Sequence, residues 1–220
     1  MTNPVVIVVG AGPGIGAAVA RRFGRAGYSP ALIARSPDKL EALGKQLQSE
    51  GFTTGWTAVD VTDGPALATA VERFGGFSGS IQHLHFNPSA FTAKDALALS
   101  ADELLGDLRL GVASLLTAVQ AARPYMSAGA RITATGGATA DRPWPQAASL
   151  GVQKAALRNL VTALDAALAS DDIRAMSLTV AGDVKEGTPF DPAHIADAIY
   201  EAGQTDSEFW DTEIRFTGRE

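Results

Sequence analysis

The sequence predicts an α/β fold with a doubly wound, mostly parallel sheet of about seven strands, in one domain over residues 1–220. Short apolar runs alternate with longer stretches of helical periodicity, which is the pattern of repeated strand–helix units. The first run, residues 5–9, is apolar at every position, as is typical of a parallel strand covered on both faces. The length suits a single domain, and the sequence has no internal repeat or long linker.

The predicted elements follow one another in regular order. Strands are expected at residues 5–9, 31–34, 57–59, 81–86, 131–135, 177–180 and, at an edge of the sheet, 213–216. Helices are expected at residues 15–25, 36–47, 63–74, 100–125, 149–168 and 192–202. Gly27 ends the first helix, and Ser36 with Pro37 begins the second. Ser100 and Glu103 form a capping box at the start of the longest helix.

Composition excludes several classes of function. The net charge is −6 and there is no basic run, so we expect no binding to nucleic acid or to an anionic membrane. The absence of cysteine excludes a disulfide framework, a thiol nucleophile and a cysteine-ligated zinc site. The first residues lack the pattern of a signal peptide, and the apolar run is too short to span a bilayer. We therefore expect a soluble, cytoplasmic protein.

A glycine-rich turn joins the first strand to the first helix. A pyrophosphate bound at such a turn needs the backbone amides of a helix N-terminus and no side chain in its path. The position of the turn, directly between a buried strand and a helix, favours a dinucleotide site over a tight turn alone. The cofactor-binding residues predicted here are Gly10, Gly12, Pro13, Gly14, Ile15 and Gly16.

The second strand ends at Ala34 and Arg35. An NAD-selective site has a carboxylate at this place for the ribose 2′-hydroxyl, whereas arginine binds the 2′-phosphate of NADP. The sequence therefore favours NADP(H) over NAD(H), with Arg35 as the selecting residue. The alternative is that Arg35 only begins a solvated loop.

The spacing of Gly10, Gly14 and Gly16 resembles the turn of the short-chain dehydrogenase/reductase family, and the resemblance extends over nearly the whole chain. It implies a Rossmann fold with strand order 3-2-1-4-5-6-7 and a homo-dimer or tetramer. Asp60 and Val61 look like the residues that hold adenine. Asn87 stands in Phe-Asn-Pro-Ser where the family has Asn-Asn-Ala-Gly, and is assigned to the cofactor site.

The same resemblance shows departures at the catalytic positions. Lys154 looks like the lysine of the family's Tyr-x-x-x-Lys motif, but Leu150 replaces the tyrosine. Gly137 stands where the family has serine, and Gly111 where it has asparagine. In the family the phenol donates a proton, the lysine lowers the phenol pKa, and the serine holds the carbonyl oxygen. Lys154 is the one catalytic candidate that remains, and it fits binding of the nicotinamide ribose better than catalysis. A solvated lysine is the alternative.

Other groups near these positions lack the family's spacing. Possible substitute proton donors are Ser149, Gln146, Thr135, Thr139, Asp141 and Tyr125, for each of which a structural role is favoured. His83 and His85 share one face of a predicted strand, but without a third ligand nearby we expect no metal site. Trp144 lies between two prolines and either walls a substrate pocket or packs a rigid loop on the core.

These observations leave three hypotheses. The first is an NADP(H)-dependent oxidoreductase with a degenerate catalytic site, acting on a small carbonyl or enone substrate with a substitute acid or water. The second is a non-catalytic NADP(H)-binding sensor or structural subunit. The third, an interaction module without nucleotide, is disfavoured by the intact glycine turn, Arg35 and Asp60.

Overall fold

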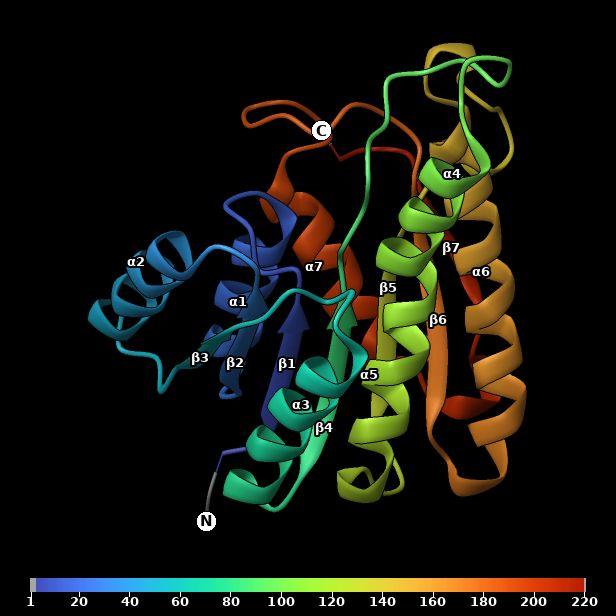
Figure 1. Cartoon of the computed structure of the whole chain (residues 1–220). Coiled ribbons are helices and arrows are strands. Elements are labelled where there is room, and N and C mark those ends of the chain that lie inside the picture. The colour runs from blue at the N-terminus through green and yellow to red at the C-terminus, as the bar shows by residue number, and fades with distance from the viewer. Residues whose placement is uncertain (1–2, 220) are drawn as a thin grey trace.

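A computed structural model describes residues 3–219, which form one seven-stranded sheet (Figure 1). Neighbouring strands are all parallel, in the order β3-β2-β1-β4-β5-β6-β7. The predicted α/β class, the Rossmann-type sheet and the strand order are confirmed. The strands are β1 (Val5–Val9), β2 (Ser29–Ala34), β3 (Gly55–Ala58), β4 (Ile81–Phe86), β5 (Arg131–Gly137), β6 (Arg174–Val180) and β7 (Glu213–Phe216).

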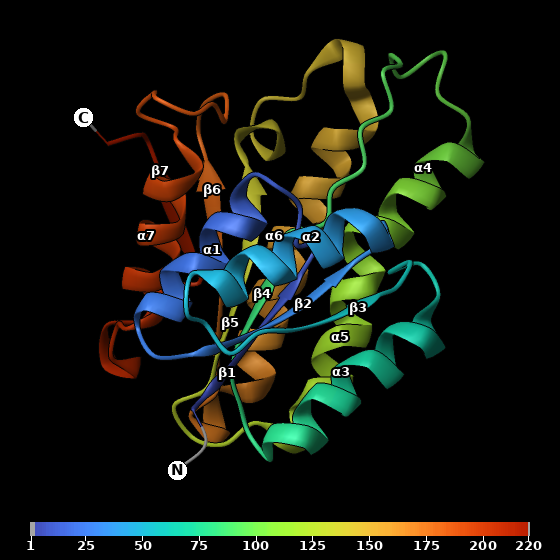
Figure 2. The same ribbon diagram turned by 90° about the vertical axis from the view of Figure 1, so that its left-hand side faces the viewer.

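Helices cover both faces of the sheet (Figures 1 and 2). One face carries α1 (Ile15–Arg25), α2 (Pro37–Ser49) and α7 (Pro192–Gly203). The other carries α3 (Gly64–Ser78), α5 (Ser114–Ala122) and α6 (Ala148–Leu168), and α4 (Ala101–Leu108) precedes α5. Each face has its own hydrophobic core, and the two cores meet only through the sheet.

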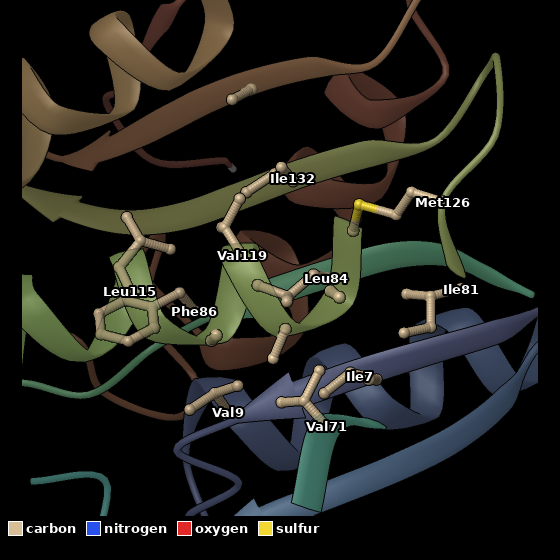
Figure 3. Packing of buried hydrophobic residues seen from close by; sticks show 14 of the residues in the cluster. Ile7, Val9, Val71, Ile81, Leu84, Phe86, Leu115, Val119, Met126 and Ile132 are labelled. Atoms are coloured by element: carbon tan, nitrogen blue, oxygen red, sulfur yellow. The ribbon is translucent and has the colours of Figure 1, made fainter. Parts of the chain in front are cut away.

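Strand β1 shows why its sequence is apolar throughout. Ile7 and Val9 face the core beneath α3 and α5, where they pack with Val71 and Leu115 (Figure 3). The intervening residue Val8 faces the opposite core with α1 and α2. A strand in the middle of a parallel sheet is buried on both sides, so alternation with polar residues is absent.

The longest predicted helix is interrupted. Helix α4 is followed by a π-helical turn, Arg109–Ala113, then by α5 and a 3₁₀ turn, Arg123–Tyr125. The π turn contains Gly111, and a Cβ built there would lie 2.3 Å from Cδ of Gln153. The Gln153 side chain therefore occupies the space beside the widened turn. The predicted capping box is confirmed, since Ser100 and Glu103 each accept a hydrogen bond from the other's backbone amide.

Strand β5 is longer than predicted. Gly136 and Gly137 pair with Thr179 and Val180 of β6 and continue the ladder. The prediction ended this strand at residue 135, but pairing with a long neighbour extends it through two glycines, which are otherwise unfavourable in strands. Strand β3 is also displaced, and begins two residues before the predicted position.

The segment Ala101–Tyr125 has the length and apolar composition of a helix that could cross a membrane, with 39% of its most apolar window buried. Its buried side packs Leu115, Ala118 and Val119 against the core between α3 and the sheet. Such packing accounts for an apolar helix in a folded domain.

Candidate functional site

The glycine-rich turn between β1 and α1 is shaped by two close contacts. Gly10 has a φ of +81°, and a Cβ built on it would lie 2.9 Å from the backbone nitrogen of Pro88. A Cβ on Gly16 would lie 2.6 Å from the carbonyl oxygen of Gly10. Both contacts are too short for any side chain, so these two glycines are required by packing and backbone conformation.

Gly12 and Gly14 are different, because nothing lies within 4 Å of a Cβ built at either position. The backbone here faces open space beside Pro13. Gly14 is the N-cap of α1, which has no side-chain cap and no acidic residue in its first turn. No side chain therefore competes for the first amides of α1, as a pyrophosphate site requires.

A hollow of about 480 Å³ lies beside this turn, between the end of β2 and α2. Arg21, Arg35 and Lys39 line it, and Ser36 caps α2 without using its hydroxyl in a side-chain cap. Arg21 is paired with Glu50 at 2.9 Å, whereas Arg35 and Lys39 form no ion pair within residues 3–219. Two cations that form no ion pair and a hydroxyl suit a phosphate.

Asp60 and Val61 follow β3. The Asp60 carboxylate accepts hydrogen bonds from the amide and hydroxyl of Thr62, at 2.9 and 2.8 Å. These bonds lower the pKa of Asp60, and the charge of Arg35 lowers it further, so the carboxylate is ionised at neutral pH. Val61 is partly buried against the core beneath α3 and α5. The segment is thus held in a fixed conformation.

Thr135 of β5 connects the remaining predicted residues. Its hydroxyl donates to Oδ1 of Asn87 at 2.8 Å, and Nδ2 of Asn87 donates to the Gly10 carbonyl at 3.1 Å. The backbone carbonyl of Thr135 accepts a hydrogen bond from Nζ of Lys154 at 2.9 Å. The glycine turn, the end of β4 and helix α6 therefore meet at one residue, which sequence reasoning considered only as a proton donor.

Two buried histidines, His85 and His83, extend the chain of hydrogen bonds beyond Thr135. Because Thr135 gives its proton to Asn87, the contact of 3.2 Å with His85 requires His85 Nε2 to donate. His85 Nδ1 then accepts from the Thr133 hydroxyl at 2.9 Å, and that oxygen accepts from His83 Nε2 at 2.8 Å. The Gly10 carbonyl can only accept, so every proton in the chain has one assigned direction.

Both histidines are neutral. Burial lowers the pKa of His85 to about 3, with a further contribution from the charge of Lys154, and burial also holds the pKa of His83 well below its usual value. Each imidazole is bonded to Thr133. Within the described part of the chain no group of three or more His, Asp or Glu residues is arranged to hold a metal ion.

Lys154 is 7% exposed, so the alternative of a solvated lysine is wrong. Burial lowers its pKa to about 8, because no carboxylate compensates the ammonium group. Its sole hydrogen bond among residues 3–219 is the one to Thr135. A cation with remaining donors is thus placed next to the end of β5.

Gly137 and Gly111, which replace the family's serine and asparagine, differ in how much space they leave for a side chain. A Cβ built on Gly137 would lie 3.6 Å from Cγ of Lys154 and 3.7 Å from the hydroxyl of Thr139, so a serine fits there. At Gly111 the space is taken by Gln153, whose amide nitrogen donates to the Asp107 carbonyl at 3.0 Å. Sequence reasoning missed Gln153; its position next to Lys154 was the available signal.

Most of the suggested substitute proton donors are already engaged in other hydrogen bonds, ion pairs or packing contacts. Ser149 is buried and donates to the Asp107 carboxylate at 2.6 Å. Arg158 and Arg215 bind Asp141 and lower its pKa, so it carries no proton at neutral pH. The ring of Tyr125 lies against Gly75 of α3.

Thr139 and Gln146 remain. Gln146 is exposed, and its amide is not an acid. The Thr139 hydroxyl has no hydrogen-bond partner in residues 3–219 and lies next to the place of the missing serine. Thr139 can therefore hold an oxygen by hydrogen bonding, although an unactivated hydroxyl is a poor acid.

An aromatic pair stands on the loops that follow β4 and β5. The rings of Phe91 and Trp144 are 5.6 Å apart and tilted by 43°, and both are largely exposed. Trp144 therefore contacts another loop residue and is not packed on the core.

Comparison with known proteins gives the family. The sequence model described as short chain dehydrogenase matches residues 4–189, so the chain belongs to the short-chain dehydrogenase/reductase family of oxidoreductases. It is 37% identical over 111 residues to a granaticin polyketide synthase putative ketoacyl reductase of Streptomyces violaceoruber, which is 48% of this chain and 39% of that protein. This chain thus matches well under half of that relative's length.

Two further proteins are similar over more of their length. An uncharacterized oxidoreductase of Listeria monocytogenes is 26% identical over 184 residues, covering 81% of this chain and 73% of that protein. A short chain dehydrogenase of Burkholderia cenocepacia, solved in complex with NADP, has a TM-score of 0.88 at 22% identity, covering 97% and 96% of the two chains. The latter similarity supports the fold.

The buried chain of hydrogen bonds predicts an effect on stability. Thr133→Val keeps the side-chain shape but leaves nitrogens of His83 and His85 without a partner, and each unsatisfied buried group costs about 1–3 kcal/mol. We expect urea unfolding to show a loss of about 2 kcal/mol or more. The control is Thr57→Val on β3, whose half-buried hydroxyl has no partner within the described residues. Equal losses in both variants would contradict the assignment.

The lowered pKa of Lys154 predicts a pH dependence. Between about pH 8 and 10.5 the unfolded chain retains a proton that the folded chain has released, so stability rises with pH in this window. We expect the free energy of unfolding to rise by up to about 1.4 kcal/mol per pH unit in the parent relative to Lys154→Met. Urea unfolding of both proteins at pH 8, 9 and 10 measures the difference. Parallel pH profiles would show that Lys154 titrates normally.

Proposed function

We propose that this chain binds NADP(H) and acts as an NADP(H)-dependent oxidoreductase without the family's proton-donating phenol. The observation that carries the proposal is the juxtaposition of open backbone at Gly12 and Gly14 with the cationic hollow at Arg35. The first suits a pyrophosphate and the second suits a phosphate further along the same ligand. A dinucleotide with an additional phosphate on its adenosine ribose matches both.

The preference for NADP(H) over NAD(H) rests on charge. Arg35 and Lys39 line the hollow without an acidic partner there, and Ser36 adds a hydroxyl. A ribose with free hydroxyls would leave these cations uncompensated, whereas a 2′-phosphate would bind both. The neighbour solved with NADP is consistent with this preference.

The bound dinucleotide would supply a hydride. In this chain, the positive charge of Lys154 would lie near the nicotinamide ribose, held in place by the Thr135 carbonyl. Thr139 offers a hydroxyl to a substrate oxygen close to Gly137. No suitable acid takes the place of Leu150, so the proton for the product would come from water. The lost general acid is typically worth about 10²–10⁴-fold in rate.

The absence of a general acid slows the reduction of some substrates more than others. A simple ketone becomes a strongly basic alkoxide on accepting hydride and therefore needs a proton in the transition state. An enone spreads the charge over several atoms and needs the acid less. We therefore propose an enone-like acceptor, with the exposed rings of Phe91 and Trp144 as part of its binding surface.

The second candidate is a non-catalytic NADP(H)-binding sensor or structural subunit. It is favoured by Gly111, because Gln153 fills the space beside this position and closes part of the family's catalytic arrangement. This candidate requires tight NADPH binding with no turnover of any acceptor.

We also propose a homo-dimer or tetramer. Exposed apolar side chains lie on α4, α5 and α6, with Leu105 61%, Leu116 38% and Val152 46% exposed. Three such residues on helices of one face favour contact with a second copy.

Calorimetric titration with NADPH and NADH tests the cofactor proposal. We expect NADPH to bind more tightly, and Arg35→Ala to weaken NADPH binding at least about tenfold while NADH binding changes little. Arg73→Ala, at an exposed position of α3 on the opposite face of the sheet, serves as the control. If neither nucleotide binds, both candidate functions fail, and equal affinities would remove the role of Arg35.

Restoring the missing groups tests the catalytic proposal. Gly137→Ser combined with Leu150→Tyr places a hydroxyl and a phenol at the family's positions, next to Lys154. We expect NADPH-dependent reduction of a panel of ketones to increase at least about 10²-fold. Gly137→Ser with Leu150→Phe supplies the same ring without the hydroxyl and should show no gain over the parent. A folded, NADPH-binding Tyr variant without any gain would favour the non-catalytic candidate.

A further inference from the structure

A second hollow lies far from the glycine turn along the strands. Its volume is about 550 Å³, and it is bounded by the amino-terminal ends of β1, β2 and β3 and by the last turns of α3. Figure 2 shows β3 at the edge of the sheet with α3 beside it. The volume lies within the range of about 300–1,000 Å³ that is usual for small-molecule sites.

Small residues create this space. Ala31 of β2 pairs with Gly55 of β3, and both line the hollow on the α3 side of the sheet. Phe74 covers Gly55, with its ring 3.2 Å from a Cβ built there, but no larger side chain fills the volume beside Ala31. The hollow is open to solvent, so a ligand could enter it without a change in the core.

The lining is mainly apolar and aromatic. Val5, Ala31 and Phe74 form the inner wall, and Phe77, which is 93% exposed, stands at the rim. A phenylalanine that is almost wholly exposed beside an apolar hollow gives an incoming apolar ligand additional surface to bury.

One positive charge is available in this lining. Arg73 has no hydrogen-bond or ion-pair partner within residues 3–219. The hydroxyl of Ser78, which also lines the hollow, is already bonded to backbone carbonyls of Phe74 and Ser80. Ser29, Thr53 and Thr57 also line the hollow, so a ligand that fits it has an apolar body and a single negative group that can accept further hydrogen bonds.

We propose that this hollow is a binding site for an amphipathic monoanion, a medium-chain fatty carboxylate. The alkyl chain lies against Val5, Ala31 and Phe74, and the carboxylate pairs with Arg73 at the rim. The site is separate from the nucleotide site, because the hollow at Arg35 lies on the α1 and α2 face and the sheet stands between them.

Calorimetry with dodecanoate tests the proposal on the whole chain. We expect one equivalent to bind, and binding to weaken at least tenfold in Arg73→Gln and again in Ala31→Leu, which fills the cavity. Arg25→Gln, on the opposite face of the sheet, is the matched control and should bind as the parent does. Dodecanol tests the charge, since it has the same chain without the anion.

The outcomes separate this proposal from the nucleotide site. NADPH affinity should be the same in the parent and Arg73→Gln, and saturating NADPH should leave dodecanoate binding unchanged. Absence of dodecanoate binding, equal binding by Arg73→Gln, or equal affinity for dodecanol would overturn it. Light scattering tests whether a second copy of the chain occupies the hollow instead. A dimer that dissociates in Arg73→Gln or Phe77→Ser, together with no binding of dodecanoate, would assign the hollow to a second copy.

Discussion

The hydrogen bond from Asn87 to the Gly10 carbonyl fixes the glycine turn to the centre of the sheet. Gly10 cannot carry a side chain, but its backbone amide and that of Ala11 donate to the Ile33 carbonyl of β2, and Asn87 adds a side-chain bond from the end of β4. Asn87 is held by Thr135, whose carbonyl also positions Lys154. The two ends of the crevice that would hold a dinucleotide are therefore aligned through one strand.

This anchor is supported by buried groups, since Thr133, Thr135 and both histidines lie in the interior and are hydrogen-bonded to one another. A hydroxyl on its own can turn either way, but the chain from His83 to Gly10 leaves each hydroxyl one arrangement. Neutral imidazoles make this possible, since a protonated His85 would offer Thr133 a second donor where an acceptor is needed. Burial keeps them neutral, and the nearby charge of Lys154 lowers the pKa of His85 further. Burial between the hydrophobic cores thus keeps the imidazoles neutral, and the neutral imidazoles leave each hydroxyl one arrangement.

The sequence predicts the sheet and the position of the crevice because both depend on local patterns. A buried strand, a glycine turn and a helix follow one another in the first 25 residues, and the structure has them at the predicted bounds. The extension of β5 through Gly136 and Gly137 depends on pairing with β6, which lies far along the chain. The role of Thr135 depends on the register of β4 and β5 and could not be predicted from local spacing.

The contact between Gly111 and Gln153 also constrains how the chain can change. Asparagine introduced at position 111 alone would collide with the glutamine, and shortening the glutamine alone would leave a void beside the π turn. The two positions are therefore epistatic, and a mutational path back to the family's full catalytic set must cross an unfavourable intermediate at this point. At Gly137, by contrast, the way is open to a single substitution. A catalytic side chain can therefore be restored by one substitution at position 137, whereas position 111 requires a coupled change at position 153.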